Sequence, residues 1–116
     1  MVNKKAYDLE ERAYIFAKNV RLLIQELPKT ISNIEDGKQL VRSSGSVAAN
    51  YIEANEKLGD KDFRFRLKIA RKEAKESVLW LKLLLDLNSK SDFELTELRN
   101  EAEELRKILS AIINKS

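Results

Sequence analysis

The sequence contains no cysteine and no histidine. Without cysteine there is no disulfide framework and no thiolate chemistry. Without either residue, a zinc site of the usual ligands cannot be built. The same holds for the di-iron site of helical bundles, which needs a Glu-x-x-His pair. We therefore expect no metal and no cofactor.

Proline and glycine are scarce, with one and three residues among 116. The glycines, Gly37, Gly45 and Gly59, are isolated, so the sequence has no Gly-rich phosphate loop. Few helix breakers, 35% charged residues and many aliphatic residues predict helix and little strand. Serine, tyrosine, lysine and carboxylate side chains form no convergent cluster. We expect no catalytic residues, and thus a protein that is not an enzyme.

Long apolar runs are also missing, since no stretch approaches the roughly 18 residues of a transmembrane helix. The first eight residues run straight into charge without an apolar segment. This pattern predicts a cytoplasmic protein that does not engage a membrane. A chain of 116 residues has the usual size of one domain, so we expect a single domain over residues 1–116.

Apolar periodicity and helix punctuation predict four helices. They are expected over 8–27, 32–57 and 60–87 and from Ser91 onward, with capping boxes at Asp8/Glu11, Ser32/Glu35 and Ser91/Glu94, an N-cap at Asp60, and stops at Pro28, Gly59 and a left-handed Asn88. The connections are only a few residues long, so sequential helices should be antiparallel neighbours. The predicted fold is an all-α, antiparallel up-down-up-down four-helix bundle.

Each helix has an apolar stripe that should face the core. The stripes are Leu9, Ala13, Phe16, Val20, Leu23, Ile24 and Leu27; Ile34, Leu40, Val41, Ser44, Val47, Ala48, Tyr51 and Ile52; Phe63, Leu67, Ala70, Ala74, Val78, Leu81 and Leu85; and Leu95, Leu98, Ala102, Leu105, Leu109 and Ile112.

The third helix has a second apolar stripe, which lies roughly opposite its core stripe. Its members are Phe65, Ile69, Trp80, Leu83 and Leu87. A helix in a lone bundle has no second core for them, so they predict a subunit interface; the alternative is a helix wrapped by its own chain. Gly45, Ser46 and Ala49 lie away from the core stripe of the second helix, where small residues permit close helix approach; the alternative is that they are tolerated surface residues. Together these features predict a homo-oligomer.

Charge is separated by helix, although the net charge of +3 is too mild by itself to imply nucleic-acid binding. Residues 57–75 hold eight basic and three acidic residues, whereas residues 92–104 hold one basic and six acidic residues. Between the two apolar stripes of the third helix lie Arg64, Lys68, Arg71, Lys75 and Lys82, spaced 4, 3, 4 and 7. This basic row is roughly 27 Å long and could follow several phosphates of RNA or DNA. The alternative is a solvated face, its field weakened by Glu73 and Glu76 pairing with neighbouring cations.

Two segments of the sequence resemble a known family. They are Ser46-Val47-Ala48-Ala49-Asn50-Tyr51-Ile52-Glu53-Ala54 and Phe63-Arg64-Phe65-Arg66-Leu67-Lys68-Ile69-Ala70-Arg71-Lys72-Glu73-Ala74-Lys75-Glu76-Ser77, which leads into Trp80-Leu81. They are similar to the four-helix bundle proteins encoded in intervening sequences of bacterial large-subunit ribosomal RNA genes. Ala48 and Ala54 stand where that family often has proline and glycine, which leaves the subgroup open.

The resemblance implies a bundle that assembles into pentameric rings. It also implies kinship with accessory proteins of diversity-generating retroelements, which bind nucleic acid and a reverse transcriptase. The expected partners are therefore further copies of the chain, RNA or DNA, and a reverse transcriptase or other protein. Asn50 and Glu53 match the family motif and are expected to set helix or subunit register through hydrogen bonds and ion pairs; the alternative is a part in a binding surface.

Two functions follow from these features. The first is a non-catalytic, homo-oligomeric protein that binds RNA or DNA through the basic row. The second is a protein-interaction scaffold or accessory subunit without direct nucleic-acid binding, in which the second stripe of the third helix holds a different protein.

Overall fold

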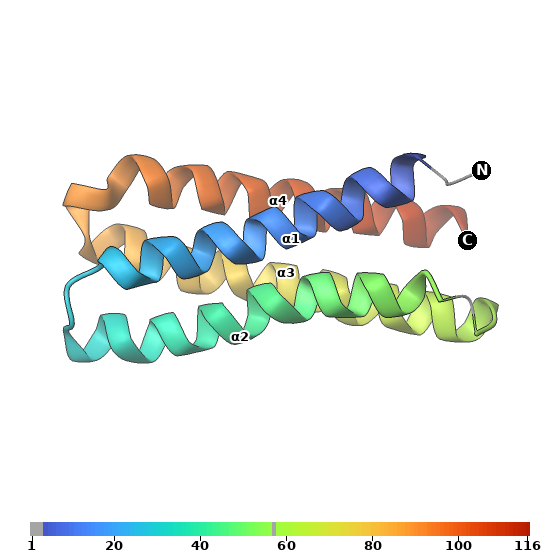
Figure 1. Cartoon of the computed structure of the whole chain (residues 1–116), viewed down its shortest axis with the longest axis horizontal. Coiled ribbons are helices and arrows are strands. Elements are labelled where there is room, and N and C mark those ends of the chain that lie inside the picture. Colours follow the sequence, from blue (N-terminus) through green and yellow to red (C-terminus); the bar gives the residue numbers. More distant parts are fainter. Residues whose placement is uncertain (1–3, 57) are drawn as a thin grey trace.

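The computed structural model describes residues 4–56 and 58–116, with side chains from Leu9 onward. It contains α1 (Lys4–Glu26), α2 (Ile31–Ala54), α3 (Asp60–Leu87), a 3-10 turn η1 (Ser89–Ser91) and α4 (Asp92–Lys115) (Figure 1). No strand occurs in these two ranges. The all-α prediction with four helices is confirmed. None of the helices so described is both long and apolar enough to cross a bilayer.

The helices lie side by side, and the chain reverses its direction at each connection in Figure 1. Contacts between α1 and α2 run from Glu10 with Asn55 to Arg21 with Val41, so residue numbers rise on one helix and fall on the other. The same order holds between α2 and α3, from Asn33 with Asn88 through Ser43 with Ser77 to Asn50 with Arg66. Contact is most extensive between α2 and α3 and between α3 and α4, and least between α1 and α4.

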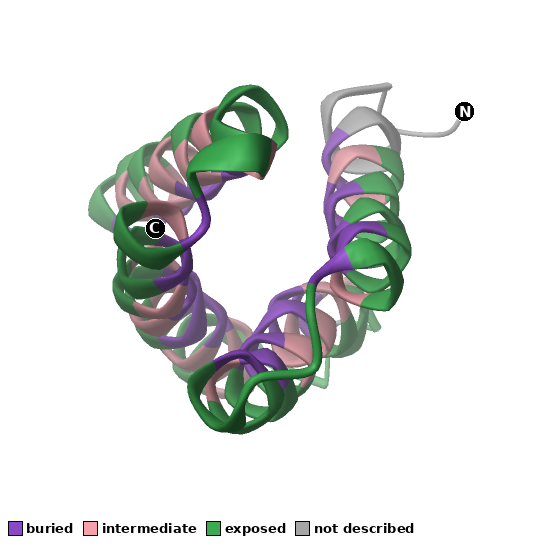
Figure 2. Ribbon diagram, turned by 90° about the vertical axis from the view of Figure 1, so that its left-hand side faces the viewer, coloured by how far each residue is buried: buried purple, intermediate pink, exposed green. Residues whose placement is uncertain are grey.

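One apolar cluster draws residues from all four helices and lies along their inner faces (Figure 2). Its fully buried large side chains are Phe16, Val20, Leu40, Val47, Leu67, Leu81, Leu84, Leu95, Leu105 and Leu109. The predicted core stripe of α1 is confirmed, and those of α3 and α4 are confirmed with additions, since Leu84 and Ile113 are also buried.

The predicted core stripe of α2 is partly wrong. Ile34 and Ile52 are 42% and 46% exposed. The buried face of α2 instead includes Asn33, Gly37 and Ser43, which are polar or small, because α2 packs closely against its two neighbours. A search for apolar residues passes over buried polar and small ones. The predicted core stripe of α2 is therefore displaced from the face that is buried.

Two predicted helix starts are also wrong. The backbone of α1 is already helical at Lys4, so Asp8 lies inside the helix and is not its cap. The N-cap of α2 is Thr30 rather than Ser32, because the Oγ1 of Thr30 accepts a hydrogen bond from the backbone N–H of Asn33 at 3.1 Å. Ser32 follows Thr30 by two residues and already lies inside α2, so it is not the cap.

The predictions for the middle of the chain need smaller changes. Helix α2 ends at Ala54, whereas its predicted end at Lys57 lies outside the described residues. Gly59 has a φ of 132° and is the N-cap of α3, so Asp60 is the first helical residue and not the cap. Ser91 precedes α4 as predicted, yet its side chain makes no capping hydrogen bond.

Asn88 ends α3 through its side chain instead of a left-handed backbone, since its φ is −138°. Its Nδ2 donates to the carbonyl of Leu84 at 2.8 Å and to Oδ1 of Asn33 at 2.9 Å. The Nδ2 of Asn33 donates back to Asn88 Oδ1 at 2.8 Å and to the carbonyl of Pro28 at 3.0 Å. Both residues are buried, so this amide pair ties the end of α3 to the connection before α2.

Arg12 ties α1 to α4. Its Nε and Nη2 donate to the two carboxylate oxygens of Glu101 at 3.1 and 2.7 Å, the bidentate geometry that favours an Arg–carboxylate pair. The hydrogen bonds that the Arg12 guanidinium donates to Glu101 also raise its pKa.

Candidate nucleic-acid interface

The five cations of the basic row share one side of α3. Arg64, Lys68, Lys75 and Lys82 are exposed, and Arg71 is half-buried. Their spacing of three, four and seven residues keeps them in one sector of a helix that is unbroken from Asp60 to Leu87. The structure therefore brings together the residues that the sequence grouped.

Two acidic residues in the middle of α3, Glu73 and Glu76, point toward α2. Glu73 Oε2 lies 3.3 Å from Nη1 of Arg42 on α2, and Glu76 Oε1 lies 3.5 Å from Nη2 of the same arginine. The alternative in which Glu73 and Glu76 pair with cations of their own helix is thus wrong, because both pair with Arg42 of α2. Among the side chains described, those of residues 9–56 and 58–116, no carboxylate oxygen lies within 4.0 Å of a side-chain nitrogen of the basic row.

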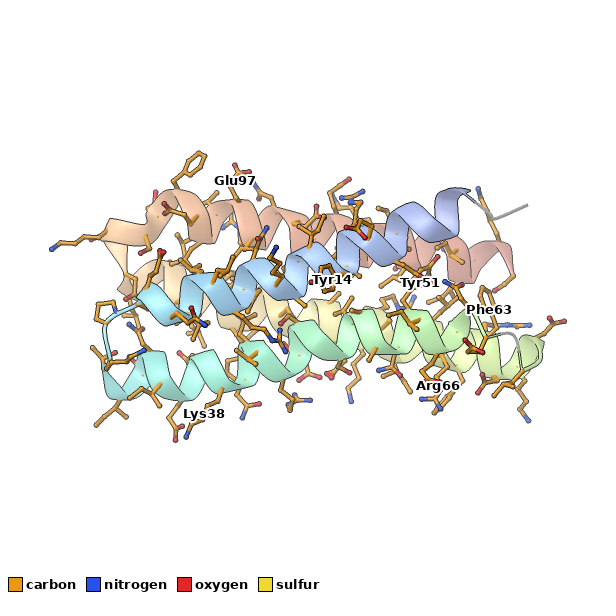
Figure 3. All side chains as sticks on the ribbon, in the orientation of Figure 1. Tyr14, Lys38, Tyr51, Phe63, Arg66 and Glu97 are labelled. Carbon is orange, nitrogen blue, oxygen red and sulfur yellow. The ribbon has the colours of Figure 1, made fainter. Side chains whose placement is uncertain are left out.

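Three acidic residues of α4 lie on the side of the helix that is next to α1. At 100° per residue, Glu97, Glu101 and Glu104 share the side of α4 on which Glu101 binds Arg12 of α1. Figure 3 shows Glu97 pointing outward from α4, away from the other helices. Within the acidic segment, Glu101 thus pairs with Arg12 of α1 and Glu103 with Arg106 of its own helix at 3.2 Å, so neither of them pairs with the basic row.

An open hollow of about 480 Å³ lies over the first two turns of α3. Its lining residues are Asp60, Lys61, Arg64, Phe65 and Lys68. The sequence assigned Phe65 to the interface stripe and Arg64 and Lys68 to the basic row, but the structure puts all three around one space. Lys61 was missed, although its spacing of four from Phe65 places it on the same side.

The rest of the second stripe does not form a single exposed face. Trp80 packs against the core and Ile69 is half-buried, whereas Leu83 and Leu87 are exposed. Trp80 lies seven residues after Glu73, on the side of α3 next to α2, so its placement opposite the core is wrong. The Nε1 of Trp80 is buried without a hydrogen-bond acceptor among the described residues.

Gly45 faces α1 of its own chain. A Cβ atom at this position would lie 2.9 Å from Nη2 of Arg21, whose guanidinium lies across α2. That guanidinium donates to the carbonyls of Ala17 and Val41, at 2.9 and 3.2 Å, and to the Oγ of Ser44 at 3.4 Å. Ser46 is half-buried and Ala49 is exposed.

Asn50 makes hydrogen bonds within α2 and to α3. Its Nδ2 donates to the carbonyl and the Oγ of Ser46 at 2.9 and 3.0 Å, and its Oδ1 accepts from Nη1 of Arg66 at 3.4 Å. Arg66 is not part of the basic row; its Nε lies 3.7 Å from Oδ1 of Asp62. Glu53 is exposed.

Sequence reasoning missed a second open hollow, of about 350 Å³, on the outer side of α1. It is lined by Tyr14, Ala17, Lys18, Arg21 and Leu22. Tyr14 and Leu22 are large apolar residues off the core stripe, and this was the available signal. Elsewhere in the described part of the chain, no three acidic side chains are close enough together to hold a metal ion.

Comparison with known proteins assigns the chain to a family. A comparison with curated proteins finds no match. A similar solved structure is the crystal structure of a protein with unknown function from the S23 ribosomal protein family of Bacteroides thetaiotaomicron VPI-5482. The two sequences are 29% identical, the comparison covers 90% of this chain and 97% of that one, and the TM-score is 0.79. The model of one family, 23S rRNA-intervening sequence protein, matches residues 5–111. The chain belongs to the family of 23S rRNA-intervening sequence proteins.

Proposed function

We propose that this chain is a non-catalytic, homo-oligomeric protein that binds RNA or DNA through the basic row of α3. One observation carries the proposal. The five cations share one side of α3 and have no carboxylate partner within 4.0 Å among the described side chains, while Arg42 of α2 pairs with Glu73 and Glu76. A row without neutralising partners attracts phosphates more strongly than the net charge of +3 suggests.

Self-assembly is the second part of the proposal. The subunit is an antiparallel up-down-up-down bundle, a topology supported by the order of contacts from α1 to α2 and from α2 to α3. Ala49, Leu83 and Leu87 are exposed on a single chain, and a second copy would cover them. The resemblance to ring-forming bundles favours a pentamer. Symmetry would then repeat the basic row on every subunit and strengthen its field.

The binding test compares two variants with the same change in net charge. The first reverses Arg64, Lys68, Arg71 and Lys75 to glutamate; the control reverses Lys18, Lys29, Lys90 and Lys115, which are exposed elsewhere. Affinity for RNA and DNA oligonucleotides is measured by fluorescence anisotropy at low salt. The row variant should lose about 100-fold or more and the control only a few-fold. Equal losses, or no binding by the unchanged protein, would remove the proposal.

A role as a protein-binding accessory subunit is favoured by one observation, the exposed apolar residues at the end of α3. Leu83 and Leu87 are exposed and lie one turn apart on the same side. A reverse transcriptase or another protein would then cover them in place of a further copy. Light scattering on the purified chain separates the two functions, because a monomer at micromolar concentration supports a different partner.

A further inference from the structure

The hollow at the start of α3 combines an exposed aromatic ring with three cations. Phe65 is 58% exposed, so the face of its ring is accessible to a ligand. Lys61 lies four residues before it and Lys68 three residues after it, so both flank the ring on the same helix side. Arg64 lines the same space. The hollow is open to solvent and suits a ligand that passes across it.

This combination matches the chemistry of an unpaired nucleotide. A base has a flat face that stacks on an aromatic ring, and its flanking phosphates are attracted to lysine and arginine. The distance along the helix axis from Lys61 to Lys68 is about 10 Å, which is the length of about three stacked nucleotides. Bases in a duplex are stacked on one another and cannot reach Phe65, whereas an unpaired base can.

We propose that the first two turns of α3 bind single-stranded nucleic acid, with one base stacked on Phe65 and its neighbouring phosphates held by Lys61, Arg64 and Lys68. The inference rests on the proposed function and narrows it, because it makes single strands, loops or ends the preferred ligand. Phe65 is thereby a binding residue and not a subunit contact.

Asp60 adds one negative charge to the hollow and so provides a second test. Its carboxylate lines the same hollow and repels phosphate. Asp60→Asn should therefore raise the affinity for single strands about two- to fivefold, while Lys61→Ala lowers it by a similar factor. Opposite effects at two adjacent positions are not expected from a general loss of folding.

The main test substitutes Phe65 and uses Phe93 as a matched control. Phe93 is a 73% exposed phenylalanine at the start of α4, outside the hollow and the basic row. Phe65→Ala should weaken binding of a single-stranded oligonucleotide about tenfold and change binding of a duplex of the same length less than twofold. Phe93→Ala should leave both affinities unchanged. Arms with RNA and DNA of one sequence show which strand is preferred.

A spectroscopic test reports stacking directly. In a Trp80→Phe background, Phe65→Trp puts a single tryptophan in the hollow. Its fluorescence should be quenched when a single-stranded oligonucleotide binds, and the affinity should equal that of the unchanged chain or exceed it. Binding without quenching would overturn the stacking arrangement.

The outcomes separate this inference from the function on which it rests. If the unchanged protein binds no nucleic acid, the proposed function fails. If it binds, but Phe65→Ala affects single strands and duplexes equally, only the single-strand inference fails. If light scattering shows that Phe65→Ala alone disrupts an oligomer, Phe65 contacts a second copy and the inference is likewise overturned.

Discussion

Replacing Arg42 with alanine tests how α2 controls the charge of α3. Arg42 is the ion-pair partner of both Glu73 and Glu76, at 3.3 and 3.5 Å. The side chain of Glu73 is only 8% exposed, so Arg42→Ala would leave a nearly buried carboxylate without its cation. Removing one partner of a fully buried pair costs about 3–5 kcal/mol, whereas an exposed pair contributes about 0.2–1 kcal/mol.

The expected loss lies between these limits. The side chain of Arg42 is 55% exposed, so solvent screens the pair and Glu73 can regain some hydration in the variant. We expect the free energy of unfolding to fall by about 1–2 kcal/mol, or about 4–8 °C in Tm for a domain of this size. Thermal and urea unfolding followed by far-UV circular dichroism, at one fixed protein concentration, measure the change.

A double-mutant cycle isolates the pair. Glu73→Gln removes the carboxylate, so adding it to Arg42→Ala should recover about 1 kcal/mol of the loss. Without Arg42, the negative charges of Glu73 and Glu76 are no longer compensated and repel phosphate. The Arg42→Ala variant should therefore also bind nucleic acid several-fold more weakly at low salt. An unchanged stability, or additive effects in the cycle, would show that the ion pair between α2 and α3 does not form as described.

Three further predictions concern other polar and small residues. Asn88→Ala should lower the free energy of unfolding by about 1–3 kcal/mol, because it leaves the buried amide of Asn33 without one partner; a urea titration with a loss below about 0.5 kcal/mol would refute this. Gly45→Ala should raise stability by about 0.5 kcal/mol and leave the oligomeric state unchanged, because helix propensity improves by about 1 kcal/mol and the flexible end of Arg21 can move; loss of an oligomer in light scattering would return Gly45 to a subunit interface. Burial raises the pKa of the Tyr51 phenol above 10.0, so the folded state keeps this proton to higher pH than the unfolded chain, and stability should fall as pH rises beyond about 10. Tyr51→Phe should reduce this alkaline loss in urea midpoints taken up to about pH 11, and an identical pH profile would contradict it.

The fold could be predicted from the sequence because its signals are local. Apolar spacing located the core residues of α1, α3 and α4, and the bounds Asp60 and Leu87 of α3 agree with the prediction. The errors occur where tertiary contacts decide. Thr30, two residues before the predicted cap, caps α2. The side chain of Asn88 ends α3 and is held by Asn33, which is fifty-five residues away in sequence.

The candidate site was predictable only in part. The spacing of the basic row placed its five cations on one side of α3, since helical periodicity alone determines that. The partner of Glu73 and Glu76 was not predictable, because Arg42 belongs to another helix and its reach depends on how α2 packs on α3. The spacing of four already groups Phe65 with Lys61, but the exposure of that side of α3 depends on which side the other helices cover, and this requires the structure.

The salt dependence of nucleic-acid binding tests the central claim most directly, because it counts the phosphates that the basic row neutralises. If five cations per subunit bind phosphates, the logarithm of affinity should fall against the logarithm of salt concentration with a slope of about −3.5 for single strands and −4.5 for duplexes. Reversal of Arg64 and Lys68 to glutamate should make the single-strand slope at least about 1.4 less steep. A slope near zero, or one that this double reversal leaves unchanged, would contradict the assignment of the row as the nucleic-acid surface.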